Sequence, residues 1–177
     1  MNRILIALLF AICAQAGDWG SAVEVRHEDE LCVAYQARID GPYLVVRANL
    51  GPGWHTFAMD NKIRAEEKLA GKPPLSIDRA TEIAPGAGVE TAGPWYQSPP
   101  QDFSRPQLRW FSWGFEREAL FVTKVRHAGS SASSVSLKAQ ACTDKICRNV
   151  DVAIPLPPAK AGTAAGSIDL KSLVQVR

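Results

Sequence analysis

The stretch Ser134–Ile154, SVSLKAQACTDKICRNVDVAI, contains two alternating segments joined by a short turn, with a cysteine beside the turn on each side. Apolar residues occupy every second position from Val135 to Ala141, and again from Val150 to Ile154. Because successive side chains of a strand point to opposite faces, each segment is predicted to be a strand with one apolar face. The stretch therefore predicts a β-hairpin and favours an all-β fold.

The same alternation predicts the face on which the two cysteines lie. Cys142 falls with Gln140 rather than with Ala141, and Cys147 falls with Asn149. Both sulfurs are expected on the polar face, unlike the inward staple between the sheets of an immunoglobulin domain. A ring of roughly six residues contributes only about 2 kcal/mol in the chain-entropy model. Two interpretations stay open: a redox-active pair, and a passive clamp of the hairpin.

The chain has four cysteines, and their positions narrow the choice of bridge. Cys13 lies in an N-terminal segment that is expected to be removed, which leaves Cys32, Cys142 and Cys147. An odd count in an exported protein means one disulfide and a lone thiol, or a pairing with another molecule. The close pair is the expected bridge, and Cys32 is interpreted as a buried small hydrophobic residue.

Further segments alternate or run apolar with β-branched residues, as strands do. The predicted strands are Leu31–Ile39, Tyr43–Leu50, Trp54–Met59, Leu75–Asp78, Ala119–His127, Val135–Ala141 and Val150–Leu156. Only Asn61–Ala70 is predicted to be helical. Many strands with frequent turns and little helix predict an immunoglobulin-like antiparallel β-sandwich.

Both ends of the chain are expected to lie outside this domain. Residues 1–16 contain a basic start, an apolar run and an A-x-A site, which together are typical of a cleaved secretory signal peptide. The protein is therefore expected in the periplasm. Residues 17–158 are predicted to form the sandwich domain, and 159–177 a linker and a tail that adds a strand or stays loose. No apolar stretch after residue 16 is long enough to span a bilayer, so the remaining chain is not expected to cross one.

Composition and motifs exclude several function classes. Twenty basic and 18 acidic residues give a net charge of +2, without the clustered basic face of a nucleic-acid binder. His27, His55 and His127 show no metal-ligand spacing, and no phosphate loop or hydrolase motif is present. No metal and no bound cofactor are expected. The segment Ile83–Gly114, rich in Gly, Pro and aromatic residues, is predicted to be an irregular binding loop or lid.

Three parts of the sequence resemble one known family. They are Gln140–Cys147, Gly53–Phe57 after a turn, and the strand Ala119–Val125. These parts resemble the N-terminal periplasmic domain of DsbD, the transmembrane thiol:disulfide interchange protein, over roughly Leu31–Pro158. The resemblance implies an immunoglobulin-like sandwich whose cysteine pair accepts electrons from a membrane partner and passes them to oxidised periplasmic proteins.

The cysteines match the active pair of that family. The resemblance implies that Cys142 attacks a partner disulfide as the accessible thiolate, and that Cys147, the less exposed sulfur, resolves the mixed disulfide. The chain departs from the family in two respects. Four residues separate the cysteines rather than five, and Arg148-Asn149 replaces the Pro pair that often follows. No membrane electron conduit and no thioredoxin-like domain are recognisable in the sequence.

Other site residues follow from the same resemblance. His55 and Phe57 fall where the family often has tyrosines near the active site. A cap that shields the cysteines would come from the segment Trp95–Trp113, with Asp102 and Phe103 as its acidic and aromatic residues.

The predicted function is thiol-disulfide interchange through the Cys142/Cys147 pair, to or from partner thiol proteins of the periplasm. A membrane thiol-reductase is an expected partner, and whether the protein is itself an enzyme of the protein-disulfide reductase type is left open. The alternative is a non-catalytic periplasmic adaptor, in which the disulfide only stiffens a hairpin and the aromatic loop binds a partner.

Overall fold

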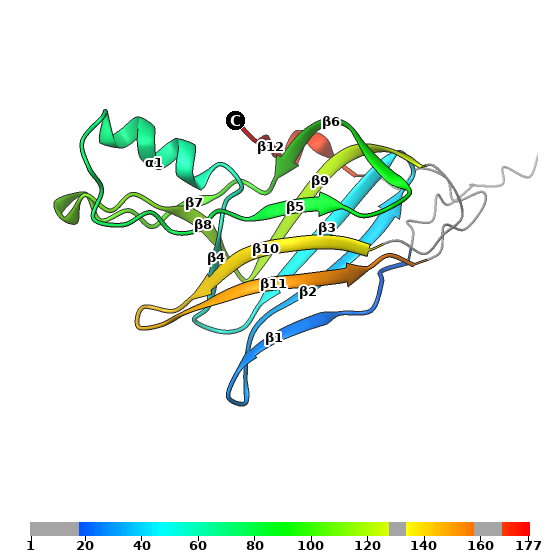
Figure 1. Ribbon diagram of the computed structural model, residues 1–177, viewed down its shortest axis with the longest axis horizontal. Helices are drawn as coiled ribbons and strands as arrows, with labels where there is room; N and C mark the ends of the chain where they lie inside the picture. The colour runs from blue at the N-terminus through cyan, green and yellow to red at the C-terminus, as the bar shows by residue number, and fades with distance from the viewer. Residues whose placement is uncertain (1–17, 128–133, 158–167) are drawn as a thin grey trace, which may run out of the picture.

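The computed structural model describes residues 18–127, 134–157 and 168–177, which form two antiparallel sheets packed face to face (Figure 1). The predicted all-β class and the immunoglobulin-like antiparallel β-sandwich are confirmed. The predicted signal peptide, residues 1–16, and residues 158–167 lie outside the described residues.

The first sheet has six strands. In spatial order they are β1 (Val23–His27), β2 (Glu30–Asp40), β3 (Tyr43–Leu50), β9 (Glu118–His127), β6 (Val89–Gln97) and β12 (Val174–Gln175). Neighbouring strands pair antiparallel throughout.

The second sheet contains the cysteine hairpin. Its order is β11 (Cys147–Pro155), β10 (Ser134–Cys142), β4 (His55–Phe57), β8 (Trp113–Glu116) and β7 (Gln101–Asp102), with β5 (Glu82–Pro85) also pairing with β10. The helix α1 (Asn61–Leu69) and the short 3-10 turns η1 (Pro106–Leu108) and η2 (Leu170–Ser172) complete the described elements. The turn between β10 and β11 lies at the same end of the molecule as α1 and β7 (Figure 1).

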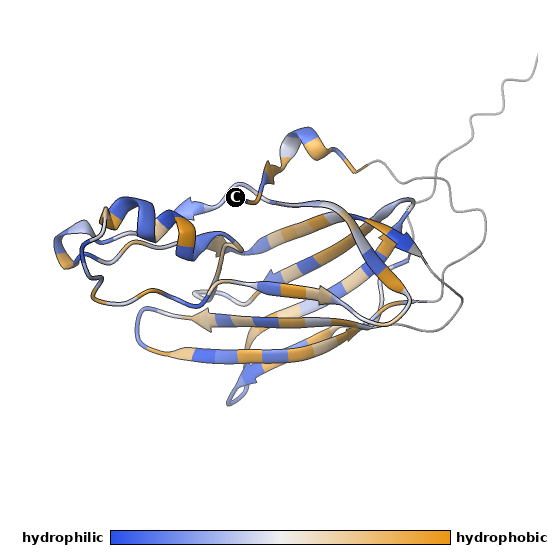
Figure 2. Cartoon of the chain, turned by 45° about the horizontal axis from the view of Figure 1, so that its top comes forward, coloured by the Kyte–Doolittle hydropathy of each residue, from blue (hydrophilic) through white to orange (hydrophobic). Residues whose placement is uncertain are grey.

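The core follows from the alternation seen in the sequence. Val135, Leu137 and Ala139 of β10 are fully buried, whereas Ser136 and Lys138 between them are exposed. Figure 2 shows the same alternation of apolar and polar residues along the hairpin. Complete burial of each Val or Leu side chain contributes about 1.5–3 kcal/mol, so the apolar face of the hairpin holds the second sheet against the first.

Most predicted elements are present with small shifts at their ends. β3 has the predicted bounds, and α1 ends one residue early because Ala70 is left-handed (φ 48°) and donates its N–H to the carbonyl of Glu66. The prediction of a strand at Leu75–Asp78 is wrong. Leu75 is exposed, and the carbonyl of Asp78 accepts from the side chain of Asn61 instead of a neighbouring strand.

The prediction that Ile83–Gly114 lacks regular structure is also wrong. The segment contains β6 and β7, and parts of β5 and β8. Gly93 and Pro94 lie inside β6, which is why the sequence did not indicate a strand. The pairing of β6 with β9 shifts between Thr91 and Trp95, and such a bulge accommodates a proline that cannot donate to the ladder.

The C-terminal segment pairs with the first sheet. β12 runs antiparallel to β6, with Val174 opposite Gln97, and the N–H of Val176 donates to the carbonyl of Trp95 at 2.9 Å. The guanidinium of Arg177 forms an ion pair with the carboxylate of Glu67 on α1. Of the two alternatives for the tail, the added strand is the one observed.

Candidate functional site

The site is built around the two cysteines at the end of the β10–β11 hairpin. Cys142 and Cys147 are direct partners in the ladder and form a disulfide, with their Cα atoms 4.0 Å apart. The predicted bridge is therefore confirmed, and so is the prediction for Cys32, a free cysteine that is fully buried. Burial raises the pKa of the Cys32 thiol, which keeps it protonated and unreactive.

The turn outside the disulfide is fixed by hydrogen bonds of its own. The N–H of Thr143 donates to the carbonyl of Ile146 at 2.8 Å. The hydroxyl of Thr143 accepts from the N–H groups of Lys145 and Ile146, each at 3.2 Å. These bonds close the hairpin beyond the cysteines, so the two sulfurs are held opposite each other by backbone geometry as well as by the S–S bond.

His55 lies beside the disulfide on the neighbouring strand. β4 pairs with β10, and His55 is the direct partner of Cys142. Directly opposed residues of an antiparallel pair project to the same face with Cβ atoms roughly 4.5–5.5 Å apart. His55, Cys142 and Cys147 therefore form a row across three adjacent strands.

Aromatic side chains pack against the His55 end of this row. The ring of His55 packs against Phe57 with centroids 5.4 Å apart and against Phe103 with centroids 5.2 Å apart. The structure thus brings together three of the residues predicted to surround the cysteines. Asp102 precedes Phe103, but its exposed carboxylate accepts from the N–H of Ser104 at 2.8 Å and caps its own turn.

The two cysteines differ sharply in exposure. Cys142 is only 2% exposed, whereas Cys147 is exposed. Alternation with the core residue Ala141 does place Cys142 on the outer face, as predicted, but that face is covered at this end of the sheet. The expectation that Cys142 is the accessible sulfur is therefore wrong: at this end of the sheet, Phe103 packs against its neighbour His55, and Arg79 contacts its neighbour Gln140.

Two polar contacts tie the covering segments to the hairpin. The N–H of Arg79 donates to the side-chain oxygen of Gln140 at 3.3 Å. The guanidinium of Arg105 lies 3.6 Å from the carboxylate of Asp144 in the turn between the cysteines. The residues that follow α1 and those that precede η1 therefore both reach the hairpin.

A buried asparagine anchors the cover to the sheet. The side chain of Asn61, fully buried at the start of α1, donates to the carbonyl of Asp78 at 2.9 Å and accepts from the N–H of Trp113 at 2.7 Å. The indole of Trp110 donates to the Asp78 carboxylate at 2.7 Å. Sequence reasoning missed Asn61 and Asp78, since no local pattern indicates contacts between positions so far apart, whereas Trp110 and Trp113 lie in the segment Trp95–Trp113 from which a cap was expected.

The electrostatics of the row centre on His55, which is half-buried. Burial lowers the pKa of its imidazole, and the nearby cation Arg105 acts in the same direction. The carboxylates of Asp78, Asp144 and Glu116 oppose this shift without cancelling it. His55 is consequently neutral at neutral pH while the cysteines are oxidised. Of these neighbours only Asp144, which lies between the cysteines in the sequence, could have been suspected in advance.

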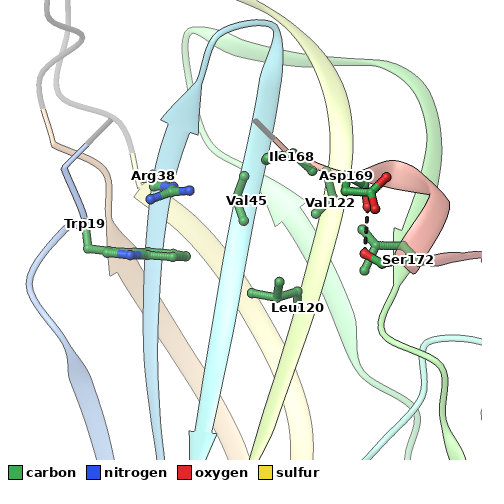
Figure 3. A pocket seen from close by; sticks show the side chains of 9 residues that line it. Trp19, Arg38, Val45, Leu120, Val122, Ile168, Asp169 and Ser172 are labelled. Atoms are coloured by element: carbon green, nitrogen blue, oxygen red, sulfur yellow. Dashed lines mark hydrogen bonds between the residues drawn. The ribbon is translucent and has the colours of Figure 1, made fainter. Parts of the chain in front are cut away.

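A concavity lies on the outer face of the other sheet. It has a volume of about 170 Å³ and is lined by Trp19, residues of β2, β3 and β9, and the C-terminal segment (Figure 3). The guanidinium groups of Arg38 and Arg47 both lie over the ring of Trp19, 4.4 and 4.3 Å from its centroid. The cavity is on the sheet that does not carry the cysteines, so it is no part of the candidate site.

Within the described residues, no cluster of His, Cys, Asp or Glu side chains is arranged to hold a metal ion. A search of the same residues for a helix long and apolar enough to cross a membrane found none.

Comparison with known proteins gave remote structural likenesses. No protein-family model and no curated protein matches the chain. One similar structure is the reduced N-terminal domain of DsbD from Neisseria meningitidis, at 10% identity and a TM-score of 0.40 over 82% of this chain and 91% of that one. Another is the GAE domain of GGA2p from Saccharomyces cerevisiae, at 10% identity and a TM-score of 0.39 over 78% of this chain and all of that one. These values describe distant likeness in architecture, and the fold assignment rests on the strand order instead.

Proposed function

We propose that this protein exchanges disulfides with partner thiol proteins through the Cys142–Cys147 pair. The observation that carries the proposal is the asymmetry of the disulfide, with one sulfur exposed at a hairpin tip and the other covered. A bridge that only clamps a hairpin does not require such asymmetry. Exposed disulfides are, in addition, the ones that tend to be reducible.

The exposures assign the order of the steps. A partner thiolate attacks the Sγ atom of Cys147, the S–S bond breaks, and Cys142 leaves as a thiolate. The second thiolate of the partner then attacks the mixed disulfide and releases Cys147. The partner dithiol is oxidised to a disulfide and the pair is reduced to two thiols, so two electrons and two protons are transferred. In the opposite direction Cys147 attacks a partner disulfide and Cys142 resolves the adduct.

The charges near the exposed sulfur fit this role. Arg148 follows Cys147 directly and Lys145 lies in the turn, and both favour a thiolate at Cys147, whereas Asp144 opposes it. No bound cofactor takes part in any step.

The compartment and the partners belong to the same proposal. The signal-like residues 1–16 and the resemblance of Gln140–Cys147 to the DsbD family support export to the periplasm. The partners would then be periplasmic thiol-disulfide proteins, with a membrane thiol-reductase as the electron donor. The role would be that of a component of a protein-disulfide reductase chain.

Trapping with single-cysteine variants tests the proposal and the order of attack. Cys142→Ser leaves the exposed Cys147 and should capture partners from a periplasmic extract as mixed disulfides that dissociate on reduction. Cys147→Ser leaves the covered Cys142 and should capture roughly tenfold less, because the attacking thiolate must reach its target. Non-reducing gels and mass spectrometry of the adducts give the readout. The double variant is the control and should yield no adduct.

The adaptor alternative predicts a different result. Leu75, Leu108 and Ile146 are 67%, 47% and 38% exposed, and they would supply apolar contact area to a partner. An adaptor would bind equally well in all the cysteine variants and lose binding when these residues are made polar. If neither single variant yields a thiol-sensitive adduct while such binding persists, the adaptor function replaces the redox function.

A further inference from the structure

The covered position of Cys142 raises the question of how its proton is handled. Under the proposed function, on which this inference rests, Cys142 must become a thiolate in every cycle, as leaving group in one direction and as attacking group in the other. Cys142 is 2% exposed, and burial disfavours a thiolate. Because so little of Cys142 is in contact with solvent, water is a poor acceptor for its proton. A neighbouring side chain therefore has to accept and return the proton.

Among the described residues, few side chains near Cys142 could accept its proton. The charged and titratable groups that face His55 are Asp78 after α1, Asp144 in the hairpin turn, Glu116 on β8 and Arg105 before η1. The carboxylates would repel a thiolate, and Arg105, which has no proton to exchange at ordinary pH, is paired with Asp144 at 3.6 Å. His55 is the direct cross-strand partner of Cys142 on the same face. It is the neighbour whose charge changes near neutral pH.

We propose that His55 exchanges a proton with Cys142 during thiol-disulfide exchange and holds it transiently as a thiolate–imidazolium pair. When a mixed disulfide on Cys147 is resolved, the Cys142 thiol gives its proton to His55. The Cys142 thiolate attacks the Sγ atom of Cys147, the S–S bond to the partner breaks, and the partner leaves as a thiolate. His55 then returns its proton to solvent or to the departing thiolate. In the reductive direction, the proton lost by the attacking partner thiol passes to His55, and His55 donates it to the Cys142 thiolate that has just been released.

The surroundings of His55 suit this role. Phe57 and Phe103 pack against the ring at 5.4 and 5.2 Å and keep it beside Cys142. Burial lowers the pKa of the imidazole, so the base is neutral before it is needed. Once a proton is transferred, the carboxylates of Asp78, Asp144 and Glu116 favour the imidazolium. The row thus combines a neutral base with an environment that accepts its charged form.

The first measurement follows the reaction of the reduced protein with oxidised glutathione. Quenched samples analysed by mass spectrometry give separate rates for formation of the mixed disulfide on Cys147 and for its resolution by Cys142. His55→Gln should slow resolution about 100-fold at pH 7, the lower end of the usual effect of general acid–base catalysis, and leave formation unchanged. The difference should shrink as the pH rises above the ordinary thiol value of about 8.5, where hydroxide removes the proton without help.

Two control variants separate proton transfer from packing. His55→Phe keeps a ring against Phe57 and Phe103 and should be as slow as His55→Gln. His27→Gln changes a histidine that contacts the side chain of Arg148 but has no cysteine opposite it, and should behave as wild type. A His55→Phe variant that resolves at the wild-type rate would show that His55 only packs, and would overturn the proposal.

A second measurement does not depend on any partner. In Cys147→Ser, the ultraviolet absorbance of the thiolate against pH gives the pKa of Cys142, and adding His55→Gln should raise it by at least one unit. Cys32 is present in both variants, so its contribution cancels. An unchanged titration would refute the coupling of His55 to Cys142. The two proposals can also fail separately. If the titration shifts but the wild-type protein forms no mixed disulfide, His55 and Cys142 are coupled and the proposed function is wrong.

Discussion

Gly114 lies at the closest approach of β8 to β4, the strand that carries His55. A Cβ atom at this position would lie 2.1 Å from the carbonyl oxygen of Thr56 and 3.1 Å from the ring of Phe103. The first contact is with backbone and cannot be relieved by a rotamer change. The absence of a side chain at Gly114 is therefore what allows β8 and the cover to pack next to His55.

Gly114→Ala should lower the free energy of unfolding by about 1–3 kcal/mol, the usual cost of overpacking. Urea unfolding followed by circular dichroism measures the change. Gly93→Ala in β6 is the matched control, since its new Cβ would meet only Cβ of Lys124 at 3.3 Å. That change should stay within about 0.5 kcal/mol. If the two variants unfold at the same urea concentration, β4 and β8 can move apart at Gly114 without losing stability.

At the level of single residues, the sequence predicted positions better than exposures. The spacing of Cys142 and Cys147 predicted their bond, and strand alternation predicted their face. The burial of Cys142 did not follow from strand alternation, because residues from other parts of the chain contact its neighbours: Phe103 packs against His55, and Arg79 donates to Gln140. These residues are far from the hairpin in the sequence, so no local pattern indicates the contacts. Phe103 was expected there only from the family resemblance.

Among the elements, α1 is fixed to the sheets by a buried carboxylate. Asp60 precedes the helix and is fully buried, and one of its oxygens accepts from the guanidinium of Arg64 and from the amide of Gln97, both at 2.8 Å. Burial would raise the pKa of Asp60, but these hydrogen bonds, the charge of Arg64 and the backbone of Arg177 together lower it below 3.8. The ionised form is therefore the one that holds the helix in place.

Asp60→Asn should destabilise the protein by about 3 kcal/mol, because it leaves the charge of Arg64 without its partner in a nearly closed site. Glu66→Gln removes the exposed pair with Lys62, where N and O lie 3.8 Å apart, and should cost less than about 0.5 kcal/mol. Chemical unfolding of both variants at neutral pH gives the comparison.

The effect of Asp60 on stability should also depend on pH. Its pKa is lower in the folded than in the unfolded state, so its contribution is fully present above the ordinary value of 3.8 and is lost as the pH falls through the lower folded value. The gap between wild type and Asp60→Asn should therefore close in acid. If the difference in unfolding free energy persists in acid, Asp60→Asn acts through packing rather than through charge.

The elements that the sequence predicted are those with regular alternation. β2, β3, β9, β10 and β11 each have a run of alternating or continuous apolar residues, and each was predicted. β6 was missed because Gly93-Pro94 interrupts it at a bulge, and β1 was missed because its exposed positions carry charges on a short strand. The false strand at Leu75–Asp78 shows the limit of short apolar runs, since no described strand pairs with it and its Leu75 N–H donates only to the carbonyl of Arg109 in a loop.

For the molecule as a whole, the core and the disulfide are independent. The main hydrophobic cluster joins residues of both sheets, and it contains neither Cys147 nor Cys142, although Cys142 itself is buried. The ring that the disulfide closes spans roughly six residues, which corresponds to about 2 kcal/mol in the chain-entropy model.

Reduction should therefore lower the free energy of unfolding by about 2 kcal/mol and leave a single cooperative transition with the same urea dependence. Unfolding curves with and without a reductant, and of the double Cys→Ser variant, measure this directly. The double variant should match the reduced wild type. A broadened transition, or one that differs between fluorescence and circular dichroism, would mean that the disulfide is needed to hold the two sheets together.

The continuous ladder of β10 and β11 has a consequence for recognition. Every residue from Ser134 to Cys142 is paired with its partner from Pro155 to Cys147, and the Thr143 bonds close the turn without any help from sulfur. Oxidised and reduced molecules should thus share one outline. A partner that must tell them apart cannot read a change of shape, and has to probe the sulfur atoms themselves. The selectivity of such a molecule would then be kinetic, set by how fast collisions turn into bonds and not by how tightly each form is held.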